Sequence, residues 1–295
     1  MQENEWLAER FEEHRYRLRS VAYRMLGSLT EADDALQDAW VRVSRAGADG
    51  VENLGGWLTT IVARVCLNML RARNARREDA LEVALPDPIV RAEGTLLPEE
   101  ETILADSVGL ALQVVIDTLS PPERLAFVLH DMFGLQFDEI GPMVGRTPEA
   151  TRQLASRARR RVKGAEVASP ERDVTRQRAV VDAFFAAARA GDFEGLVALL
   201  HPDIVLRADF GPGRPNRSAV FHGPAAVAGQ ARLANAAAQV HPALVNGAAG
   251  AVITLRGRPV AVLGFTVAEG RIVEIDAIGD PTRVARVAAA VLGGA

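Results

Sequence analysis

A predicted helix over residues 148–163 carries side chains that could read DNA. Apolar residues recur every four positions along it, which places them on one face and leaves a second face polar. Arginine, glutamine and serine side chains can reach base edges or phosphates in the major groove. Further basic residues near the end of the helix would add salt-dependent phosphate contacts. The DNA-binding candidates here are Arg146, Thr147, Glu149, Arg152, Gln153, Ser156, Arg157 and Arg160.

The elements before this helix form a helix–turn–helix pattern. Ser120-Pro121-Pro122-Glu123 fits a capping box with proline in the first turn, and predicts a helix over 122–131. A short helix follows around 137–144, and Gly145-Arg146-Thr147 turns the chain into the basic helix. Two helices joined by a tight, glycine-containing turn are typical of DNA-binding domains. The alternative is a basic, solvated helix in an all-α domain.

A second basic block lies between Arg64 and Arg77, with five arginines and no acid. Such a run is usually a solvated helix face, but this one also presents Trp57 and Asn68 and follows a glycine-rich loop over 44–56. The loop could accept an unstacked base while the arginines hold the backbone of a nucleic acid. The candidates in this block are Asn68, Arg71, Arg73, Arg76 and Arg77.

The charges along the chain are sorted into blocks, although the 295-residue chain has a net charge of only −4. Residues 78–106 hold nine acids and one arginine, whereas residues 146–163 hold seven basic residues and one glutamate. Pro86, Pro88 and Pro98 within the acidic strip indicate a linker. A solvated surface would interleave its signs more evenly. The pattern predicts two anion-binding modules joined by a linker that avoids anions.

The hydrophobic periodicity predicts helices up to about residue 168 and a different fold beyond it. Residues 6–77 are predicted to form helices, and a further helical stretch covers 103–119. After Ser169-Pro170, two predicted helices precede four strand-like runs, at 204–208, 251–255, 259–267 and 271–277. Helices followed by antiparallel strands argue for an α+β domain. We therefore expect a multidomain protein with two all-α domains and one α+β domain.

Composition excludes several classes of protein. The single cysteine cannot form an internal disulfide, which excludes a disulfide-stapled scaffold. One cysteine and five scattered histidines argue against a structural zinc site, and no metal or cofactor is expected. The N-terminus is charged from its third residue, and no apolar run approaches the ~18 residues that span a bilayer. We expect a soluble, cytoplasmic protein that does not bind membranes.

Two regions of the chain resemble the conserved regions of bacterial extracytoplasmic-function (ECF) sigma factors. The strings that carry the resemblance lie within residues 8–77 and 100–164. They are EADDALQDAWVRV, GGWLTTIVARVCLNMLRARNARRE and LSPPERLAFVLHDMFGLQFDEIGPMVGRTPEATRQLASRARRRV. The resemblance implies a factor without enzymatic activity that directs core RNA polymerase to specific promoters and starts transcription. It also implies core polymerase and promoter DNA as partners.

The resemblance assigns roles along the chain. The loop over 44–54 and the helix with Asn68 and Arg71 would capture and melt the minus-ten element, whereas the helix over 148–162 would read the minus-thirty-five element. The second helical domain would sit on the β flap of polymerase, and the acidic linker would lie in the path of nascent RNA. The helix that docks the β′ coiled coil would present Asp33, Asp34, Gln37, Asp38 and Trp40.

The remainder of the chain, residues 172–295, looks like a SnoaL-like domain of the NTF2-like fold, a cone of helices over a curved sheet. The matching strings are VVDAFFAAARAGDFEGLVALLHPDIVLRAD, VNGAAG and GFTVAEGRIVEIDAIGDP. This resemblance implies a pocket between the helices and the sheet, so a small-molecule ligand in the C-terminal domain is an open alternative.

A subgroup of ECF factors carries such a tail, with a proline-containing linker motif, a glycine-rich loop and a short C-terminal motif. Their counterparts here are the stretches 85–88, 209–214 and 280–284. Phe210, Pro212 and Asp280 depart from the subgroup's pattern. The resemblance assigns a regulatory role to Asp209, Gly211, Gly213, Arg214, Asp280, Pro281 and Arg283.

Two other functions stay open on the residues alone. The chain could be a DNA-binding regulator without sigma activity, whose C-terminal domain senses a small molecule. It could also be a SnoaL-type enzyme, because carboxylates and histidines do acid–base work in related folds, although fold alone does not give function. The groups available for such work are Asp203, Asp209, Asp276, His201 and His222.

The expected domain boundaries follow from these assignments. They are 1–77 for the first sigma domain, 78–102 for the acidic linker, 103–168 for the second sigma domain with its helix–turn–helix, 172–282 for the SnoaL-like regulatory domain and 283–295 for a C-terminal tail. The SnoaL-like domain would set activity in cis by packing against the linker or the first domain, because one chain holds it at high effective concentration.

Overall fold

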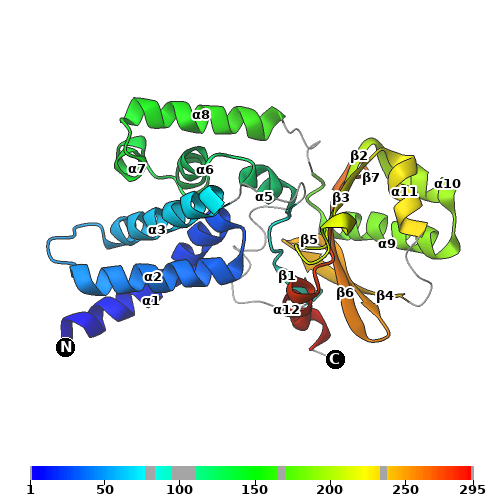
Figure 1. Ribbon diagram of the computed structural model, residues 1–295, viewed down its shortest axis with the longest axis horizontal. Helices are drawn as coiled ribbons and strands as arrows, with labels where there is room; N and C mark the ends of the chain where they lie inside the picture. The colour runs from blue at the N-terminus through cyan, green and yellow to red at the C-terminus, as the bar shows by residue number, and fades with distance from the viewer. Residues whose placement is uncertain (1, 77–83, 95–109, 165–169, 233–237, 294–295) are drawn as a thin grey trace. The chain divides into compact units, whose positions relative to one another are not determined.

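The computed structural model describes residues 2–76, 84–94, 110–164, 170–232 and 238–293, and Figure 1 shows its elements. The chain divides into two compact units. Met1–Ala80 and Gln113–Glu166 form one of them, which we call the helical unit. Leu81–Leu112 and Val167–Ala295 form the other, which we call the mixed unit. The linker therefore groups with the C-terminal part of the chain.

The first part of the helical unit consists of α1 (Gln2–Leu26), α2 (Leu29–Ala46) and α3 (Leu54–Arg76). Ser28 begins α2, because its hydroxyl accepts a hydrogen bond from the backbone N–H of Glu31. The buried side chains of α2 recur at three- and four-residue spacings, which is the stripe expected of a helix that packs on one side. They are Ala32, Ala35, Leu36, Ala39 and Val43.

The loop between α2 and α3 is shorter than the sequence predicts. It covers residues 47–53, whereas the glycines suggested a loop over 44–56. The physical reason lies at the start of α3, where the side chain of Asn53 accepts a hydrogen bond from the backbone N–H of Gly56 at 3.0 Å. This cap stabilises the first turn, so that both Gly55 and Gly56 become helical.

The second part of the helical unit holds five helical elements. They are α5 (Leu110–Asp117, which begins in the mixed unit), α6 (Pro121–Phe127), the π-helical turn η1 (Val128–Met132), α7 (Phe137–Val144) and α8 (Pro148–Gly164). The predicted capping box is confirmed, since Ser120 and Glu123 satisfy each other's backbone groups at the start of α6. A second capping box, from Gln136 and Glu139, begins α7.

The turn between α7 and α8 is tight because two glycines permit it. Gly145 has φ of 66°, in the left-handed region that favours glycine. A Cβ atom added at Gly141 would lie only 2.7 Å from the carbonyl oxygen of Arg146. The helix–turn–helix expected from the sequence is therefore present, and its close approach depends on Gly141.

A buried arginine joins the two parts of the helical unit. The guanidinium of Arg124, on α6, donates to the carbonyl oxygen of Met25 at 2.8 Å, near the C-terminal end of α1. It also donates to the side chain and to the carbonyl oxygen of Asp117, both at 2.6 Å. Arg124, in the second part, thus donates a hydrogen bond to a carbonyl oxygen at the end of α1, in the first part.

The mixed unit is built on a seven-stranded sheet in the order β1-β4-β5-β6-β7-β2-β3. The strands are β1 (Val90–Ala92), β2 (Leu200–Asp209), β3 (Ala219–His222), β4 (Ala238–Val245), β5 (Ala248–Leu255), β6 (Arg258–Ala268) and β7 (Arg271–Ile278). Neighbours are antiparallel except β2 and β7, which are parallel. The helical elements are α9 (Val174–Ala190), α10 (Phe193–Leu199), η2 (Pro215–Arg217), α11 (Pro224–Arg232) and α12 (Pro281–Leu292). The α+β fold class is confirmed, although β1, β3, β4, α11 and α12 were not predicted.

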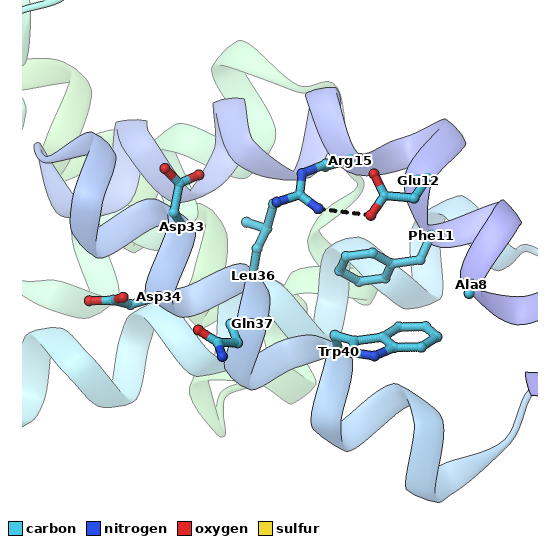
Figure 2. Close-up of a pocket in the computed structure, with 9 residues that line it drawn as sticks. All are labelled: Ala8, Phe11, Glu12, Arg15, Asp33, Asp34, Leu36, Gln37 and Trp40. Carbon is cyan, nitrogen blue, oxygen red and sulfur yellow. Dashed lines mark hydrogen bonds and ion pairs between the residues drawn. The ribbon is translucent and has the colours of Figure 1, made fainter.

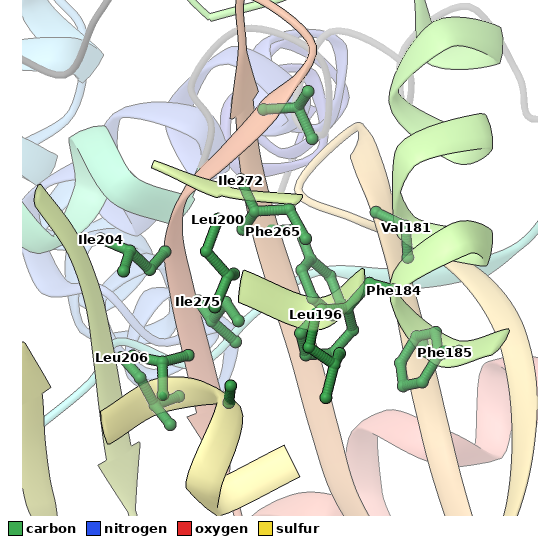
Figure 3. Packing of buried hydrophobic residues seen from close by; sticks show 14 of the residues in the cluster. Val181, Phe184, Phe185, Leu196, Leu200, Ile204, Leu206, Phe265, Ile272 and Ile275 are labelled. Carbon is green, nitrogen blue, oxygen red and sulfur yellow. The ribbon is translucent and has the colours of Figure 1, made fainter. Parts of the chain in front are cut away.

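The core of the mixed unit lies between α9, α10, α11 and one face of the sheet, as Figure 3 shows. Phe184, Phe185 and Phe265 meet edge to face at its centre, with ring centres 5.6 and 5.7 Å apart. The cluster's buried members are aliphatic or aromatic throughout. Along β2 they are Leu200, Ile204 and Leu206, so Val205 and Arg207, which alternate with Ile204 and Leu206, occupy the opposite face.

Helix α12 corrects one expectation, that residues 283–295 form a tail beyond the domain. Asp280 begins the helix by accepting a hydrogen bond from the backbone N–H of Arg283, and Pro281 occupies the first helical position. Val284 and Ala288, four residues apart, are both fully buried. The segment is therefore an amphipathic helix within the mixed unit. Among the described residues, no helix has the length and apolar character needed to cross a membrane.

Candidate nucleic-acid interface and linker site

The DNA-binding candidates on and before α8 share one exposed surface. Every one of the eight residues predicted there is exposed: Arg146, Thr147, Glu149, Arg152, Gln153, Ser156, Arg157 and Arg160. The Thr147 hydroxyl accepts a hydrogen bond from the backbone N–H of Ala150 at 3.2 Å and so caps the helix. Backbone and Thr147 hydrogen bonds lower the pKa of Glu149 below its ordinary value. The face thus offers one fixed anion among several cations.

Three arginines in the second half of α8 lie close to acids of the same unit. Arg159 lies 2.6 Å from Asp131, and Arg161 lies 3.0 Å from Glu123. Arg157, a predicted DNA contact, also lies 3.6 Å from Glu123. These ion pairs fasten α8 to α6 and η1. A phosphate would have to compete with Glu123 for Arg157, which the sequence does not reveal.

The basic block on α3 divides in a similar way. Asn68 and Arg71 are exposed. Arg73 instead donates to the carbonyl oxygen of Leu26 at 3.2 Å and to Glu31 at 3.1 Å, which joins α3 to the start of α2. Arg76 is the last residue of α3, and Arg77 lies outside the described residues.

Four of the five predicted polymerase-binding residues border a depression of about 430 Å³ between α1 and α2, shown in Figure 2. Its lining residues are Ala8, Phe11, Glu12, Arg15, Asp33, Asp34, Leu36, Gln37 and Trp40. The rings of Phe11 and Trp40 form its apolar end, with centres 5.3 Å apart. Asp33 is held by Arg19 through two contacts of 2.7 and 2.9 Å, whereas Asp34 and Gln37 are exposed. Asp38 is exposed but does not line the depression.

In the mixed unit, Arg283 clamps the linker. Its Nε lies 2.5 Å from the carboxylate of Asp87, its Nη1 lies 2.7 Å from Asp209, and its Nη2 donates to the carbonyl oxygen of Leu85 at 2.7 Å. Burial alone would lower the pKa of Arg283, but the two carboxylates raise it above its ordinary value. Arg286 adds a second contact to Asp87 at 2.6 Å. The arginine is therefore charged and fully engaged.

The loop after β2 supplies the other half of the clamp. Buried Asp209 accepts a hydrogen bond from the backbone N–H of Leu85 at 2.9 Å with one oxygen and from Gly211 at 2.8 Å with the other. Gly211 has φ of 74°, and a Cβ there would lie 2.1 Å from the carboxylate of Asp280. Asp209, Gly211, Asp280 and Arg283 are thus brought together. Gly213, Arg214 and Pro281, from the same predicted set, are exposed.

A second anchor holds the linker a few residues further along. Ile89 and Asn246 exchange two hydrogen bonds, one from each backbone N–H, at 2.7 and 2.8 Å. Strand β1 then pairs with β4, and Arg178 contacts both Glu93 and the carbonyl oxygen of Ala243. We call the contacts of Arg283, Asp209, Asn246 and Arg178 with residues 85–93 the linker clamp.

Sequence reasoning missed Asn246 and Arg178 in the linker clamp. Asn246-Gly247 did carry a usable signal, because Asn-Gly between two apolar runs predicts a tight hairpin turn. Both residues have positive φ, 49° and 79°, and they join β4 to β5. The side-chain amide of Asn246 is therefore fixed at the end of β4, beside the linker. No local pattern marks Arg178, whose partners are distant in sequence.

The groups considered for acid–base catalysis do not gather in the apolar core. Asp203 and His222 are exposed, and His201 is partly exposed. Asp209 is engaged in the linker clamp. Asp276 lies opposite Arg207 on the sheet face away from the core, and Arg207 donates to it at 3.2 Å. Burial raises the pKa of Asp276 to about 6, against the opposing effect of Arg207.

Comparison with known proteins matches both helical parts of the chain to sigma factor families. Residues 10–76 match the Sigma-70 region 2 family, and residues 109–162 match the Sigma-70, region 4 family. The ECF RNA polymerase sigma factor SigJ of Mycobacterium tuberculosis is 37% identical over 199 residues, which cover 68% of this chain and 64% of that protein. The matched stretch is thus less than two thirds of that relative's length.

Two further relatives extend the match. The probable ECF RNA polymerase sigma factor SigI of M. tuberculosis is 33% identical over 196 residues, 66% of this chain and 67% of that protein. The crystal structure of M. tuberculosis SigJ has a TM-score of 0.72 and 31% identity, and the match covers 94% of this chain and 97% of that one. The expected sigma regions and the expected fold class are confirmed together. The chain belongs to the family of extracytoplasmic-function RNA polymerase sigma factors.

Proposed function

We propose that this protein directs core RNA polymerase to specific promoters and starts transcription. The observation that carries the proposal is the exposed polar face of α8, presented by a helix–turn–helix in a chain that also carries sigma region 2. Arg152, Gln153 and Ser156 have the donors and acceptors that read base edges in the major groove. Helix α8 would read the minus-thirty-five element in this way.

The first part of the helical unit would handle the minus-ten element and polymerase. Exposed Asn68 and Arg71 on α3 would contact the melted strand, together with the loop over residues 47–53. The depression between α1 and α2 would receive the β′ coiled coil, with Trp40 as an aromatic anchor and Asp34 and Gln37 at its edge. Region 4 would contact the β flap.

The mixed unit would restrain this activity in cis by holding the linker. The linker clamp holds residues 85–93 through contacts that include a largely buried ion pair and a strand pairing. The clamp would thus keep the linker from the path of nascent RNA. Because both partners belong to one chain, the clamp acts at high effective concentration, and polymerase must displace it.

The proposal is tested by binding to duplex promoter DNA in the presence and absence of core polymerase. If the protein acts as a sigma factor, it should form a stable, sequence-selective complex with promoter DNA only when polymerase is present. The Asp34→Ala and Gln37→Ala variants should weaken capture of the chain by polymerase, whereas Glu194→Ala, an exposed acid of the mixed unit, should not. Tight selective binding by the chain alone would contradict the proposal and favour a free-standing, ligand-sensing regulator.

A further inference from the structure

Helix α7, which precedes α8, carries an aromatic residue, Phe137, that contacts Arg152 of α8. The Arg152 guanidinium carbon lies 5.5 Å from the centre of the Phe137 ring, within the range of a cation–π contact. Phe137 is the first residue of α7, whose start is fixed by the capping box of Gln136 and Glu139. The ring therefore sits on a rigid part of the helix–turn–helix.

The Phe137 ring also contacts a second side chain of the same unit, His130. It stacks on the imidazole of His130, with ring centres 3.9 Å apart and planes inclined by 28°. The His130 ring is fixed in turn, because its Nδ1 lies 2.8 Å from the carbonyl oxygen of Leu135. His130 thus orients Phe137, and Phe137 contacts Arg152.

This support comes from the π-helical turn η1. A π-helical turn changes the direction of the side chains that follow it, and such turns are frequent at functional sites. Here η1 supplies His130 to the stack and Asp131 to the ion pair with Arg159, 2.6 Å apart on α8. One irregular turn therefore contributes to contacts with α8 near its start, at Arg152, and past its middle, at Arg159.

An arginine that reads a base gains from being held before it binds. A free arginine side chain loses rotamer freedom when it pairs with the two acceptors of guanine, and a preorganised one loses less. Glu149, one helical turn before Arg152, adds a negative charge on the same surface. The positive charge of Arg152 contributes to the lowered pKa of Glu149. Arg152 is therefore flanked by an aromatic ring and a carboxylate.

Resting on the proposed function, we propose that Phe137 is a positioning residue that orients Arg152 for recognition of one base pair of the minus-thirty-five element, with guanine as the base read. His130 acts through Phe137 and touches no DNA. Arg152 differs from Arg159 and Arg161 of the same helix, which pair with acids.

The test is transcription by core polymerase from a library of promoters with a randomised minus-thirty-five element, using the full chain. Arg152→Ala should abolish the preference at one base pair. Phe137→Leu should weaken the preference at that same base pair by about two- to fivefold, the loss expected for an exposed cation–π contact. Phe137→Tyr keeps the ring and should restore it. Thermal unfolding of each variant shows whether the fold is kept.

The outcomes are distinct. If Phe137→Leu folds and leaves the Arg152-dependent base pair unchanged, or weakens all positions equally, the inference is overturned. The same holds if Arg152→Ala lowers the output for every sequence and reduces the salt dependence, because Arg152 then contacts a phosphate. If the wild-type chain selects no promoter at all, the proposed function fails, and this inference fails with it.

Discussion

Arg283 and Asp209 lie 74 positions apart in the chain, yet Nη1 of Arg283 is 2.7 Å from Oδ2 of Asp209. The same carboxylate oxygen accepts a hydrogen bond from the backbone of Leu85 in the linker. Arg283 in turn reaches Leu85 and Asp87. The two motifs of the mixed unit and the motif of the linker therefore form one hydrogen-bonded group, in which each part satisfies buried polar atoms of the other two.

Replacement of Arg283 should release the linker. Arg283→Gln leaves two carboxylates, Asp87 and Asp209, without their main counter-charge in a largely buried place. Breaking a buried pair costs about 3 kcal/mol. Hydrogen exchange of the amides of residues 85–93 should become about a hundredfold faster. Transcription at limiting protein concentration should rise, because the linker is no longer held.

Arg286→Gln is the matched control for Arg283. Its side chain is 46% exposed and contacts Asp87 of the linker, so its loss should cost less than about 1 kcal/mol, as exposed ion pairs do. Linker exchange should change little in this variant. Equal effects of the two substitutions, or an unchanged linker in Arg283→Gln, would show that the clamp does not depend on Arg283.

Loss of Arg124 should destabilise the helical unit. Arg124→Met removes the donors to Met25 and Asp117 at a site where the arginine side chain is only 4% exposed. We expect the free energy of unfolding to fall by about 3 kcal/mol. The three tryptophans all lie in the helical unit: Trp6 in α1, Trp40 in α2 and Trp57 in α3. Their fluorescence during urea unfolding therefore reports on this unit.

The control variant for Arg124→Met is Arg161→Met. Arg161 also pairs with an acid of α6, but its side chain is 56% exposed. Its loss should cost at most about 1 kcal/mol, as exposed ion pairs do. A midpoint for Arg124→Met that coincides with that of Arg161→Met would refute the role assigned to the buried contact.

Asp276 should make the stability of the mixed unit depend on pH. Its pKa is about 6 in the folded chain and 3.8 when exposed, so the folded state binds the proton more tightly. Stability from this group is fully present below about pH 4 and falls as the pH rises to about 6, by up to about 3 kcal/mol. Asp276→Asn removes this dependence.

The measurement for Asp276 is urea unfolding by circular dichroism between pH 4 and 7.5, with tryptophan fluorescence to separate the helical unit. The difference in unfolding free energy, wild type minus Asp276→Asn, should decrease from pH 4 to pH 6 and level off above it. A difference that is constant across this range would show that Asp276 ionises normally in the folded chain.

Substitution of Gly141 should disturb the helix–turn–helix. In Gly141→Ala the new Cβ would meet the backbone oxygen of Arg146 at 2.7 Å, and a backbone atom cannot move aside cheaply. A cost of about 1–3 kcal/mol is expected, with weaker promoter selection because α8 is displaced. Gly229, in helix α11, has open space at its Cβ, so Gly229→Ala should keep or raise the melting temperature. Similar melting temperatures for the two variants would contradict the close approach.

Local sequence signals predicted much of the fold. The capping box at Ser120 and Glu123, the four-residue spacing along α8 and the glycine turn at Gly145 all act within a few residues, and each appears in the structure. The exposed face of α8 followed from the same periodicity. The DNA contacts themselves stay a prediction, because spacing shows which face is free and not what binds there.

Features that depend on distant partners were not predictable in the same way. Strand β1 has only three residues and forms by pairing with β4. A segment this short has no hydrophobic periodicity from which a strand could be predicted. The ion pairs of Arg157 and Arg159 with Glu123 and Asp131 cross from one helix to another. Helix α12 is different, since Asp280-Pro281 and the spacing of Val284 and Ala288 were local signals that the expected boundary at 283 cut through.

Multi-round transcription with purified core polymerase shows whether this chain confers promoter-specific initiation. The templates are promoters selected from a genomic library, and the chain is added in full length. If the chain confers promoter-specific initiation, discrete transcripts form only when both proteins are present. Core polymerase that gives no transcripts with the chain, while the chain alone shifts duplex DNA tightly and selectively, would contradict this function.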